Sequence, residues 1–355
     1  MTSRRLKHVA ILTATAILAV LIVGGGWWAV SRYQATHGPE CTVPRPSGGT
    51  VDPAGASEAD GASGASSAVG GSSADDAVDA VDADDADTVD ADGRPLDTKP
   101  LGMDAVQLQH ASTINAVGLE RGESPRARVI AVATAWQESS LRNINRGDRD
   151  SLGLFQQRPS QGWGDADQIM DPIYASSQFY NHLAKVRGWQ EMSLAKAAQA
   201  VQRSGFPDAY AKWEWDALTL VDQLSGDSVL TLSCRDGAHA STVDAPVRSA
   251  LAGTSGANPE ITTLLAAAQA ELAGLTVTQI PAGKTAASVT VTLPSAPNNV
   301  AARALAAWFI AHSASFGVVD VAVEDQLWTH HAWQPAVERL QPGAVTVSVT
   351  VTATA

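Results

Sequence analysis

Metal-binding side chains are scarce in this sequence. The chain has only two cysteines, Cys41 and Cys234, and its eight histidines are scattered along its length. No CxxC or HxxxH spacing occurs, so the sequence lacks the paired ligands from which structural and catalytic metal sites are commonly built. We therefore expect no metal centre, and no other cofactor is indicated.

Positive charge and long apolar runs are also limited. Lysine and arginine number 24 against 37 aspartates and glutamates, a net charge of −13. Such a balance argues against nucleic acid as a partner. Residues 9–30 form one uncharged apolar run without Cys, His, Asp or Glu. Metal transport would require several spans or ligands within the membrane, so it is disfavoured.

The apolar run at residues 9–30 is long enough to cross a hydrocarbon core of about 30 Å. Arg4, Arg5 and Lys7 precede it, which predicts that residues 1–8 are cytoplasmic and that the rest of the chain lies outside. A cleaved signal peptide is the alternative, although the segment after Val23 offers Gly-Gly-Gly-Trp-Trp rather than a clean small-x-small cleavage site. We expect an uncleaved single-pass membrane anchor with extracytoplasmic domains.

Glycine, serine, alanine and aspartate dominate residues 31–100, where no apolar core can form. Between Asp75 and Asp97 there are ten aspartates and one arginine, a net charge of −9. Most of the net negative charge of the chain therefore lies in this stretch rather than on a folded surface. We predict a disordered, extended linker that holds the folded part away from the membrane.

Two folded regions are expected after this linker. Apolar spacing and capping residues predict a mainly α domain at residues 101–235, with helices at 104–119, from 125 to just beyond Glu138, at 171–186, 193–203 and 207–226. Ser124, Asp171 and Ser193 are the expected N-caps. After a linker at 236–256, a small α+β domain of unassigned role is predicted at 257–355, with helices at 259–272 and 300–315 and strands at 289–293, 318–323 and 345–351.

One carboxylate, Glu138, lies near the C-terminal end of an otherwise apolar helix that begins at Ser124 and Pro125. The negative end of the helix dipole and the apolar surroundings both disfavour ionisation, so we expect a raised pKa. A carboxylic acid that stays protonated near neutral pH can protonate a glycosidic oxygen, which makes Glu138 a candidate general acid. The alternative is an ion pair with Arg142 at i+4 and no catalytic role.

Two motifs around this helix resemble the Glu-Ser and Gly-Leu-Met-Gln signatures of soluble lytic transglycosylases and goose-type lysozymes. They are Gln137-Glu138-Ser139-Ser140-Leu141 and Asp150-Ser151-Leu152-Gly153-Leu154-Phe155-Gln156-Gln157. The run from about 101 to 234 also resembles an actinobacterial family of membrane-anchored proteins with a transglycosylase-like domain, sometimes labelled heavy-metal transporters. The resemblance implies a lysozyme-like fold and cleavage of the MurNAc–GlcNAc bond in peptidoglycan glycan strands.

The same resemblance suggests residues that contact the glycan. Ser139 and Gln156 match motif positions that help to shape the acid and contact the sugar, and Phe155 belongs to the same motif. Tyr210 falls where the family often has a glycan-contacting tyrosine. Trp163 lies in a glycine-rich turn and could stack on a sugar ring, with core packing as the alternative.

One motif departs from the family pattern, since Val-Gln-Arg-Ser at residues 201–204 replaces Tyr-Asn-Ala-Gly. No obvious second carboxylate accompanies Glu138. Asp148 and Asp150 are the nearest candidates for a hydrolytic base, but an arginine-rich turn favours ion pairing there. The lytic transglycosylases act with a single Glu, so that reaction is expected. A catalytically silent glycan-binding or scaffold protein is the main alternative, and metal handling by the acidic run is a weaker one.

Cys41 and Cys234 bracket the linker and the helical domain on the oxidising side of the membrane. A disulfide is therefore expected, with two free thiols as the alternative. In the chain-entropy description, closing so long a loop stabilises the fold by at most about 5 kcal/mol.

Overall fold

The structure is a computed structural model, and it describes residues 41–45, 99–235, 259–272, 276–279, 288–292, 299–329 and 332–349. The predicted span at 9–30 lies outside the described residues, as do most of the linker at 31–100 and all of the linker at 236–256. Within the described ranges, no helix is long and apolar enough to cross a membrane. The fold is mixed helical with two small sheets.

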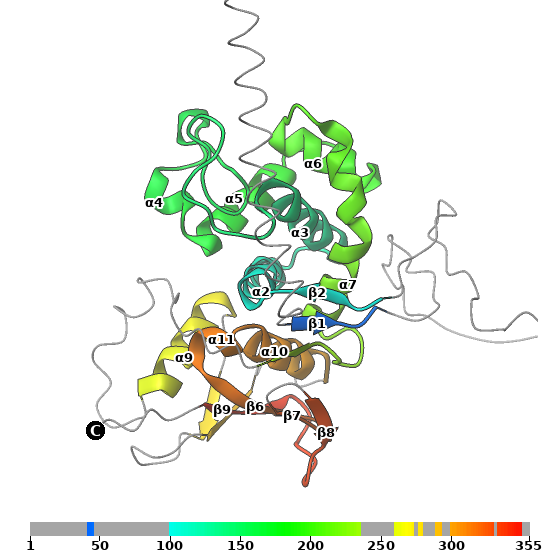
Figure 1. Ribbon diagram of the computed structural model, residues 1–355, viewed down its shortest axis with the longest axis vertical. Coiled ribbons are helices and arrows are strands. Elements are labelled where there is room, and N and C mark those ends of the chain that lie inside the picture. Colours follow the sequence, from blue (N-terminus) through cyan, green and yellow to red (C-terminus); the bar gives the residue numbers. More distant parts are fainter. Residues whose placement is uncertain are drawn as a thin grey trace, which may run out of the picture.

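The first part of the described chain is mainly helical, as predicted (Figure 1). Its helices are α2 (Ala105–Glu120), α3 (Pro125–Ser139), α4 (Ala166–Ile169), α5 (Pro172–Leu183), α6 (Leu194–Gln202) and α7 (Glu214–Ser225), with short 3₁₀ helices η1 (Pro159–Gln161), η2 (Trp189–Glu191) and η3 (Pro207–Trp213). The N-caps Ser124, Asp171 and Ser193 are confirmed, because each side chain accepts a hydrogen bond from a first-turn amide. The last predicted helix is divided into η3 and α7.

A three-stranded antiparallel sheet joins distant parts of the chain in the order β2-β1-β3. Its strands are β1 (Cys41–Val43), β2 (Leu101–Met103) and β3 (Ser233–Cys234). Cys41 lies opposite Cys234 in the register, and a disulfide joins the two. The predicted disulfide is therefore confirmed, and the alternative of two free thiols is wrong.

The position of β1 corrects the predicted linker. Residues 41–43 were assigned to the linker at 31–100, but they form a buried strand of the folded part, and Val43 pairs with Leu101. Residues 46–98, which include the acidic run, therefore connect two paired strands, β1 and β2. This segment is an insertion between two neighbouring strands, so it does not space the folded part from the predicted anchor.

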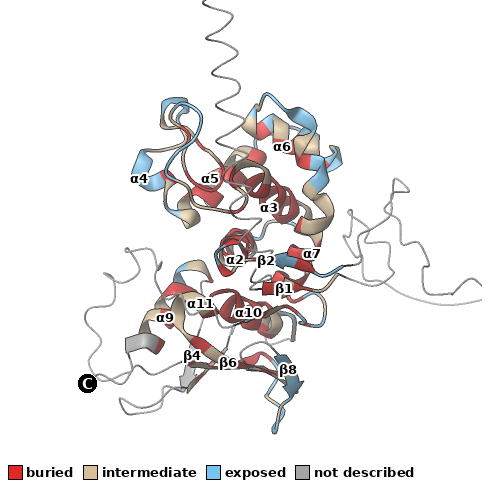
Figure 2. Ribbon diagram, viewed as in Figure 1, coloured by how far each residue is buried: buried red, intermediate tan, exposed pale blue. Residues whose placement is uncertain are grey.

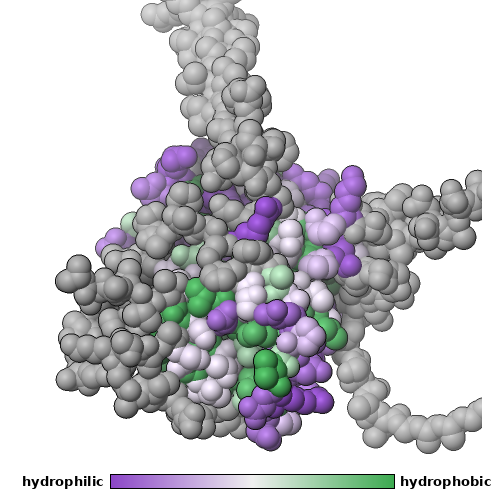
Figure 3. Space-filling model, turned by 60° about the horizontal axis from the view of Figure 1, so that its bottom comes forward, coloured by the Kyte–Doolittle hydropathy of each residue, from purple (hydrophilic) through white to green (hydrophobic). Residues whose placement is uncertain are grey.

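The remaining elements form a six-stranded antiparallel sheet, in the order β4-β5-β9-β6-β7-β8, with three helices. They are α9 (Pro259–Glu271), β4 (Thr276–Gln279), β5 (Ser288–Thr292), α10 (Asn299–Ala311), α11 (Ser313–Phe316), β6 (Val318–Val323), β7 (Gln326–Thr329), β8 (Ala332–Pro335) and β9 (Ala344–Val349). The predicted helices and strands of this region are confirmed within a few residues at their ends. Helix α10 packs on β6 and β9. On the molecular surface toward β7 and β8, apolar and polar side chains are interspersed (Figure 3).

The two regions pack against each other through α10, which contacts α2 and α7. Figure 2 shows α2, α3 and α10 buried along most of their length. Hydrogen bonds cross the same junction. The Trp328 indole donates to the Ser233 hydroxyl at 3.0 Å, and Arg303 donates to the carbonyl of Gly226 at 2.9 Å. The buried apolar residues form one continuous cluster, while the division at 236–256 into two domains stays a prediction.

Candidate active site

Glu138 lies in the last turn of α3. This helix is buried from Ala127 to Trp136, as its apolar sequence predicts, and it ends at Ser139. Ser140 caps it in the left-handed conformation, with φ of 55°. The Glu138 side chain is half-buried, so the core helix presents one carboxyl group at the boundary between the core and the solvent.

Two side chains from a distant segment contact this carboxyl group. The Tyr210 hydroxyl, from η3, donates to Glu138 Oε1 at 2.6 Å. The Gln202 side chain, at the end of α6, bonds Glu138 as well and also donates to the Phe155 carbonyl at 2.8 Å. The two ends of the segment 202–210, Gln202 and Tyr210, therefore both bind the Glu138 carboxyl group.

Burial raises the pKa of Glu138, while the hydrogen bonds from Tyr210 and Gln202 partly oppose this effect. The predicted direction is confirmed, with loss of hydration as the main cause. Burial and the adjacent Glu138 charge raise the pKa of Tyr210, so its hydroxyl remains a donor across the neutral range. The bond from Tyr210 uses Oε1 as its acceptor, so Oε2 is the oxygen that can carry the acidic hydrogen.

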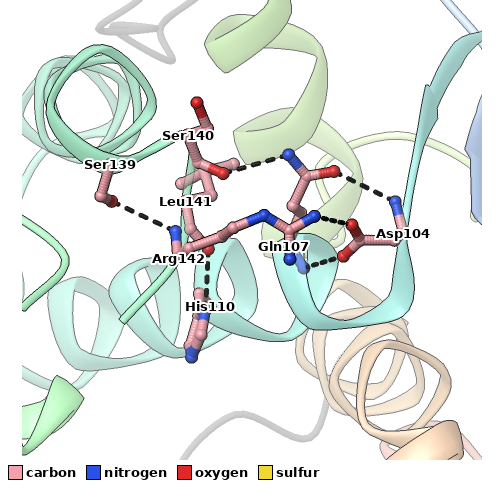
Figure 4. A network of polar contacts seen from close by, with 7 residues as sticks. All are labelled: Asp104, Gln107, His110, Ser139, Ser140, Leu141 and Arg142. Carbon is pink, nitrogen blue, oxygen red and sulfur yellow. Dashed lines mark hydrogen bonds and ion pairs between the residues drawn. The ribbon is translucent and has the colours of Figure 1, made fainter. Parts of the chain in front are cut away.

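The alternative interpretation of Glu138, an ion pair with Arg142, is wrong. Arg142 forms its ion pair with Asp104, the N-cap of α2 (Figure 4). The cause is local, because α3 ends before residue 142 and both Ser140 and Leu141 have positive φ values. The chain turns away from the helix axis there, and the i+4 geometry of a continuous helix no longer applies.

The side chains of Ser139 and Gln156 form hydrogen bonds with backbone groups. Ser139 is buried, and its hydroxyl donates to the Leu154 carbonyl at 2.7 Å and accepts from the Arg142 amide at 3.1 Å. These bonds join the end of α3 to the following turn, and the predicted sugar contact of Ser139 stays a prediction. Gln156 is half-buried and donates to the carbonyls of Arg146 and Gly153, at 3.3 Å each.

The two aromatic candidates near the turn differ in exposure. Phe155 is fully buried and stacks on Phe179 at 4.8 Å between ring centroids, so its ring is part of the core. The predicted substrate contact of Phe155 stays a prediction. Trp163 is half-buried, with one face of its indole stacked on His182 at 3.9 Å. Trp163 is therefore packed on one face and is still partly exposed to solvent.

Tyr210 was predicted as a glycan contact, but its side chain is fully buried and its hydroxyl is bonded to Glu138. The structure places the Tyr210 hydroxyl against the Glu138 carboxyl group.

The two candidate bases, Asp148 and Asp150, lie in different surroundings. Hydrogen bonds from the Ser160 hydroxyl, from the Ser160 amide at 2.8 Å and from Arg158 at 2.7 Å lower the pKa of Asp150. Asp148 is exposed and approaches only Arg149, at 3.8 Å.

Sequence reasoning missed two residues that contact Glu138 or its neighbours, and one exposed residue on the segment that contacts the acid. Gln202 contacts the acid, and the Trp213 indole donates to Gln137 at 3.0 Å and stacks on Trp136. Phe206 lies on the loop between Gln202 and Tyr210, and 77% of it is exposed, which is unusual for a phenylalanine. The sequence signal was a Gly-Phe-Pro turn within a segment that otherwise looks helical.

In the described part of the chain, no three His, Cys, Asp or Glu side chains lie close enough together to hold a metal ion. No family model matches the chain, and no curated protein matches it. The geometry around Glu138 and the motif resemblance are therefore the two grounds for a function.

Proposed function

We propose that the protein is a peptidoglycan-cleaving enzyme, with a lysozyme-like domain at residues 101–235 and Glu138 as its general acid. The observation that carries the proposal is the half-buried carboxyl group of Glu138, whose pKa is raised by burial and which receives a hydrogen bond from Tyr210. A protonated carboxylic acid is the group needed to protonate a glycosidic oxygen.

The proposed reaction uses the single acid twice. Glu138 first donates the proton on Oε2 to the oxygen that leaves N-acetylmuramate, and the glycosidic bond breaks. The resulting carboxylate then accepts the proton of the 6-hydroxyl of the same sugar, whose oxygen closes a 1,6-anhydro ring. No water is consumed and Glu138 ends protonated, so one carboxyl group is sufficient. The ion pair of Asp150 with Arg158 supports a reaction without a second carboxylate.

The 202–210 segment and the turn after α3 are the proposed glycan-contacting region. Gln202 and Tyr210 orient the acid, and the exposed ring of Phe206 lies between them in the sequence. An exposed aromatic ring can stack on the apolar face of a sugar. Trp163 and Gln156 remain proposed contacts, because both are partly exposed.

We also propose that residues 9–30 anchor the protein in the cytoplasmic membrane, with the folded part outside. The Cys41–Cys234 disulfide supports an oxidising compartment. Because β1 begins at Cys41, only residues 31–40 would separate the folded part from the anchor. A ten-residue segment spans at most about 35 Å, so the enzyme would act on glycan strands close to the membrane.

A catalytically silent glycan-binding or scaffold protein is the second candidate. The departure at residues 201–204 from the family pattern favours it. On this alternative the fold would be retained, and the half-buried acid would have no reacting bond to protonate.

Replacement of the acid distinguishes the two candidates. Glu138→Gln in the intact chain keeps the size of the side chain but cannot supply the proton, so release of soluble fragments from peptidoglycan should fall about 10²–10⁴-fold. Binding to peptidoglycan should survive. The exposed Glu191→Gln is the matched control and should release fragments at the wild-type rate. Binding by the wild type without any fragment release would favour the silent scaffold.

A further inference from the structure

The residues that follow Glu138 have an unusual backbone. Ser140 and Leu141 are consecutive non-glycine residues in the left-handed region, with φ of 55° and 57°. This conformation is disfavoured for residues with a Cβ atom, and two in succession persist only where the surroundings enforce them. Glu138 is separated from this pair by one residue.

The same two residues close the helical turn that carries the acid. The Ser140 amide donates to the Trp136 carbonyl at 2.9 Å, and the Leu141 amide donates to the Ala135 carbonyl at 3.2 Å. These bonds span Glu138, so its turn stays wound only while residues 140 and 141 keep their left-handed conformation. A change at the pair would therefore change the direction of the Glu138 side chain.

Two buried polar side chains of α2 hold the pair in place (Figure 4). The Gln107 amide nitrogen donates to the Ser140 carbonyl at 3.0 Å. The Gln107 amide oxygen accepts from the Asp104 amide at 3.1 Å, which fixes the orientation of the group. His110 Nδ1 lies 2.7 Å from the Leu141 carbonyl, and because a carbonyl oxygen only accepts, this nitrogen is the donor.

We propose that Gln107 and His110 are positioning residues for Glu138, which hold the left-handed pair and thereby aim the acid at Tyr210 and at the bond to be cleaved. The inference rests on the proposed function for its catalytic meaning. Each acts through a backbone carbonyl, Gln107 on that of Ser140 and His110 on that of Leu141. Apolar side chains of the same size would fill the space but leave both carbonyls without these donors.

The test combines kinetics with a measurement that needs no substrate. Gln107→Leu removes the donor at similar volume, and His110→Leu does so at the second carbonyl. Gln109→Leu is the matched control, because Gln109 is also on α2 and bonds Ser315 in the C-terminal region. For each intact variant, kcat, KM and the titration of the ¹³C-labelled Glu138 carboxyl group are measured by steady-state assay and NMR.

Gln107→Leu and His110→Leu should each lower kcat at least tenfold with KM changed less than twofold. They should also raise the titration midpoint of Glu138, because the hydrogen bond from Tyr210 is weakened. Gln109→Leu should change neither. If Gln107→Leu or His110→Leu does not fold, the other of these two variants alone tests the proposal. Folded variants whose kcat and Glu138 titration match the control would overturn the proposal. If the wild type releases no fragments but Gln107→Leu and His110→Leu still raise the Glu138 titration midpoint, the positioning role is upheld and the enzyme is refuted.

Discussion

At the scale of single residues, the chemistry of the candidate site depends on contacts between residues that are far apart in the sequence. The raised pKa of Glu138 could be predicted, because an apolar helix places any carboxylate in poorly hydrated surroundings. Its partner could not. Tyr210 is 72 residues away, and a buried tyrosine that donates to an acid has the same local pattern as one that contacts a ligand.

Tyr210→Phe should move the pH profile of the enzyme toward higher pH. The lost hydrogen bond lowers the pKa of Glu138 in the wild type, so its removal raises that pKa further. A general acid works only while protonated, and activity is lost as the pH rises through its pKa. The high-pH limb of kcat should therefore shift upward, and kcat should fall about tenfold through poorer alignment.

The matched control is Tyr174→Phe, which removes a hydroxyl that donates to the Trp163 carbonyl at 3.2 Å. This variant should keep the wild-type pH profile. A profile of Tyr210→Phe that coincides with the wild type in both limbs would mean that the Tyr210 hydroxyl does not tune the acid.

Phe206→Ala should weaken glycan binding without changing the acid. Because its exposed ring is proposed to stack on a sugar, KM for glycan strands should rise about three- to tenfold, which corresponds to the 0.5–1.5 kcal/mol of an aromatic contact. Steady-state kinetics on purified strands measures the change. Val337→Ala, another fully exposed apolar side chain, is the control and should have no effect. Equal KM values for both variants would remove Phe206 from the glycan site.

At the scale of elements, the long helices and strands were predictable and the short or distant contacts were not. The caps at Ser124, Asp171 and Ser193 mark helix starts locally, so the sequence alone was sufficient. Strands β1 and β2 have three residues each and pair across an acidic insertion, so no local period shows them. The Arg142–Asp104 pair depends on left-handed residues that helix periodicity does not predict.

The junction between α7 and α10 should depend on Gly226. This residue has φ of 72°, and a Cβ atom there would lie 2.2 Å from the Val300 carbonyl oxygen. Gly226→Ala should therefore lower the free energy of unfolding by about 2–4 kcal/mol, from backbone strain and from separation of the two helices. Urea denaturation of the intact chain measures the loss.

Gly162→Ala separates the two contributions. Gly162 also has a positive φ, 79°, but nothing lies within 4 Å of an added Cβ. Its variant should lose only about 1 kcal/mol, the cost of the left-handed backbone. If Gly226→Ala were no more destabilising than Gly162→Ala, the close approach of α10 to Gly226 would not contribute to stability.

At the scale of the whole molecule, the folded part is connected at β1, β2 and β3. The disulfide joins β1 to β3, and residues 46–98 are inserted between the paired ends of β1 and β2. The sequence suggested a spacer, because composition reports charge and hydration but not where the two ends of a segment meet. The packing of the two regions through α10 could not be predicted either, because α10 contacts helices that are far from it in the sequence, α2 and α7.

Replacing residues 46–98 with a four-residue turn should leave the fold and the disulfide intact. A shorter connection between paired strands costs less loop-closure entropy, so the free energy of unfolding should rise by about 1–2 kcal/mol. Thermal unfolding and mass mapping of the non-reduced chain measure both. A Gly/Ser replacement of equal length is the control for charge and should keep the wild-type stability. Loss of the Cys41–Cys234 pair in the shortened chain would contradict the hairpin arrangement.

The central claim is that Glu138 protonates a glycosidic oxygen without the help of a second carboxylate, and the masses of the products test it most directly. Intact wild-type protein is incubated with peptidoglycan, and the released fragments are weighed beside those from Glu138→Gln. We predict fragments with 1,6-anhydro ends, lighter by one water than hydrolysed fragments, and none from the variant. Fragments with hydrolysed ends, or equal release by Glu138→Gln, would contradict the claim.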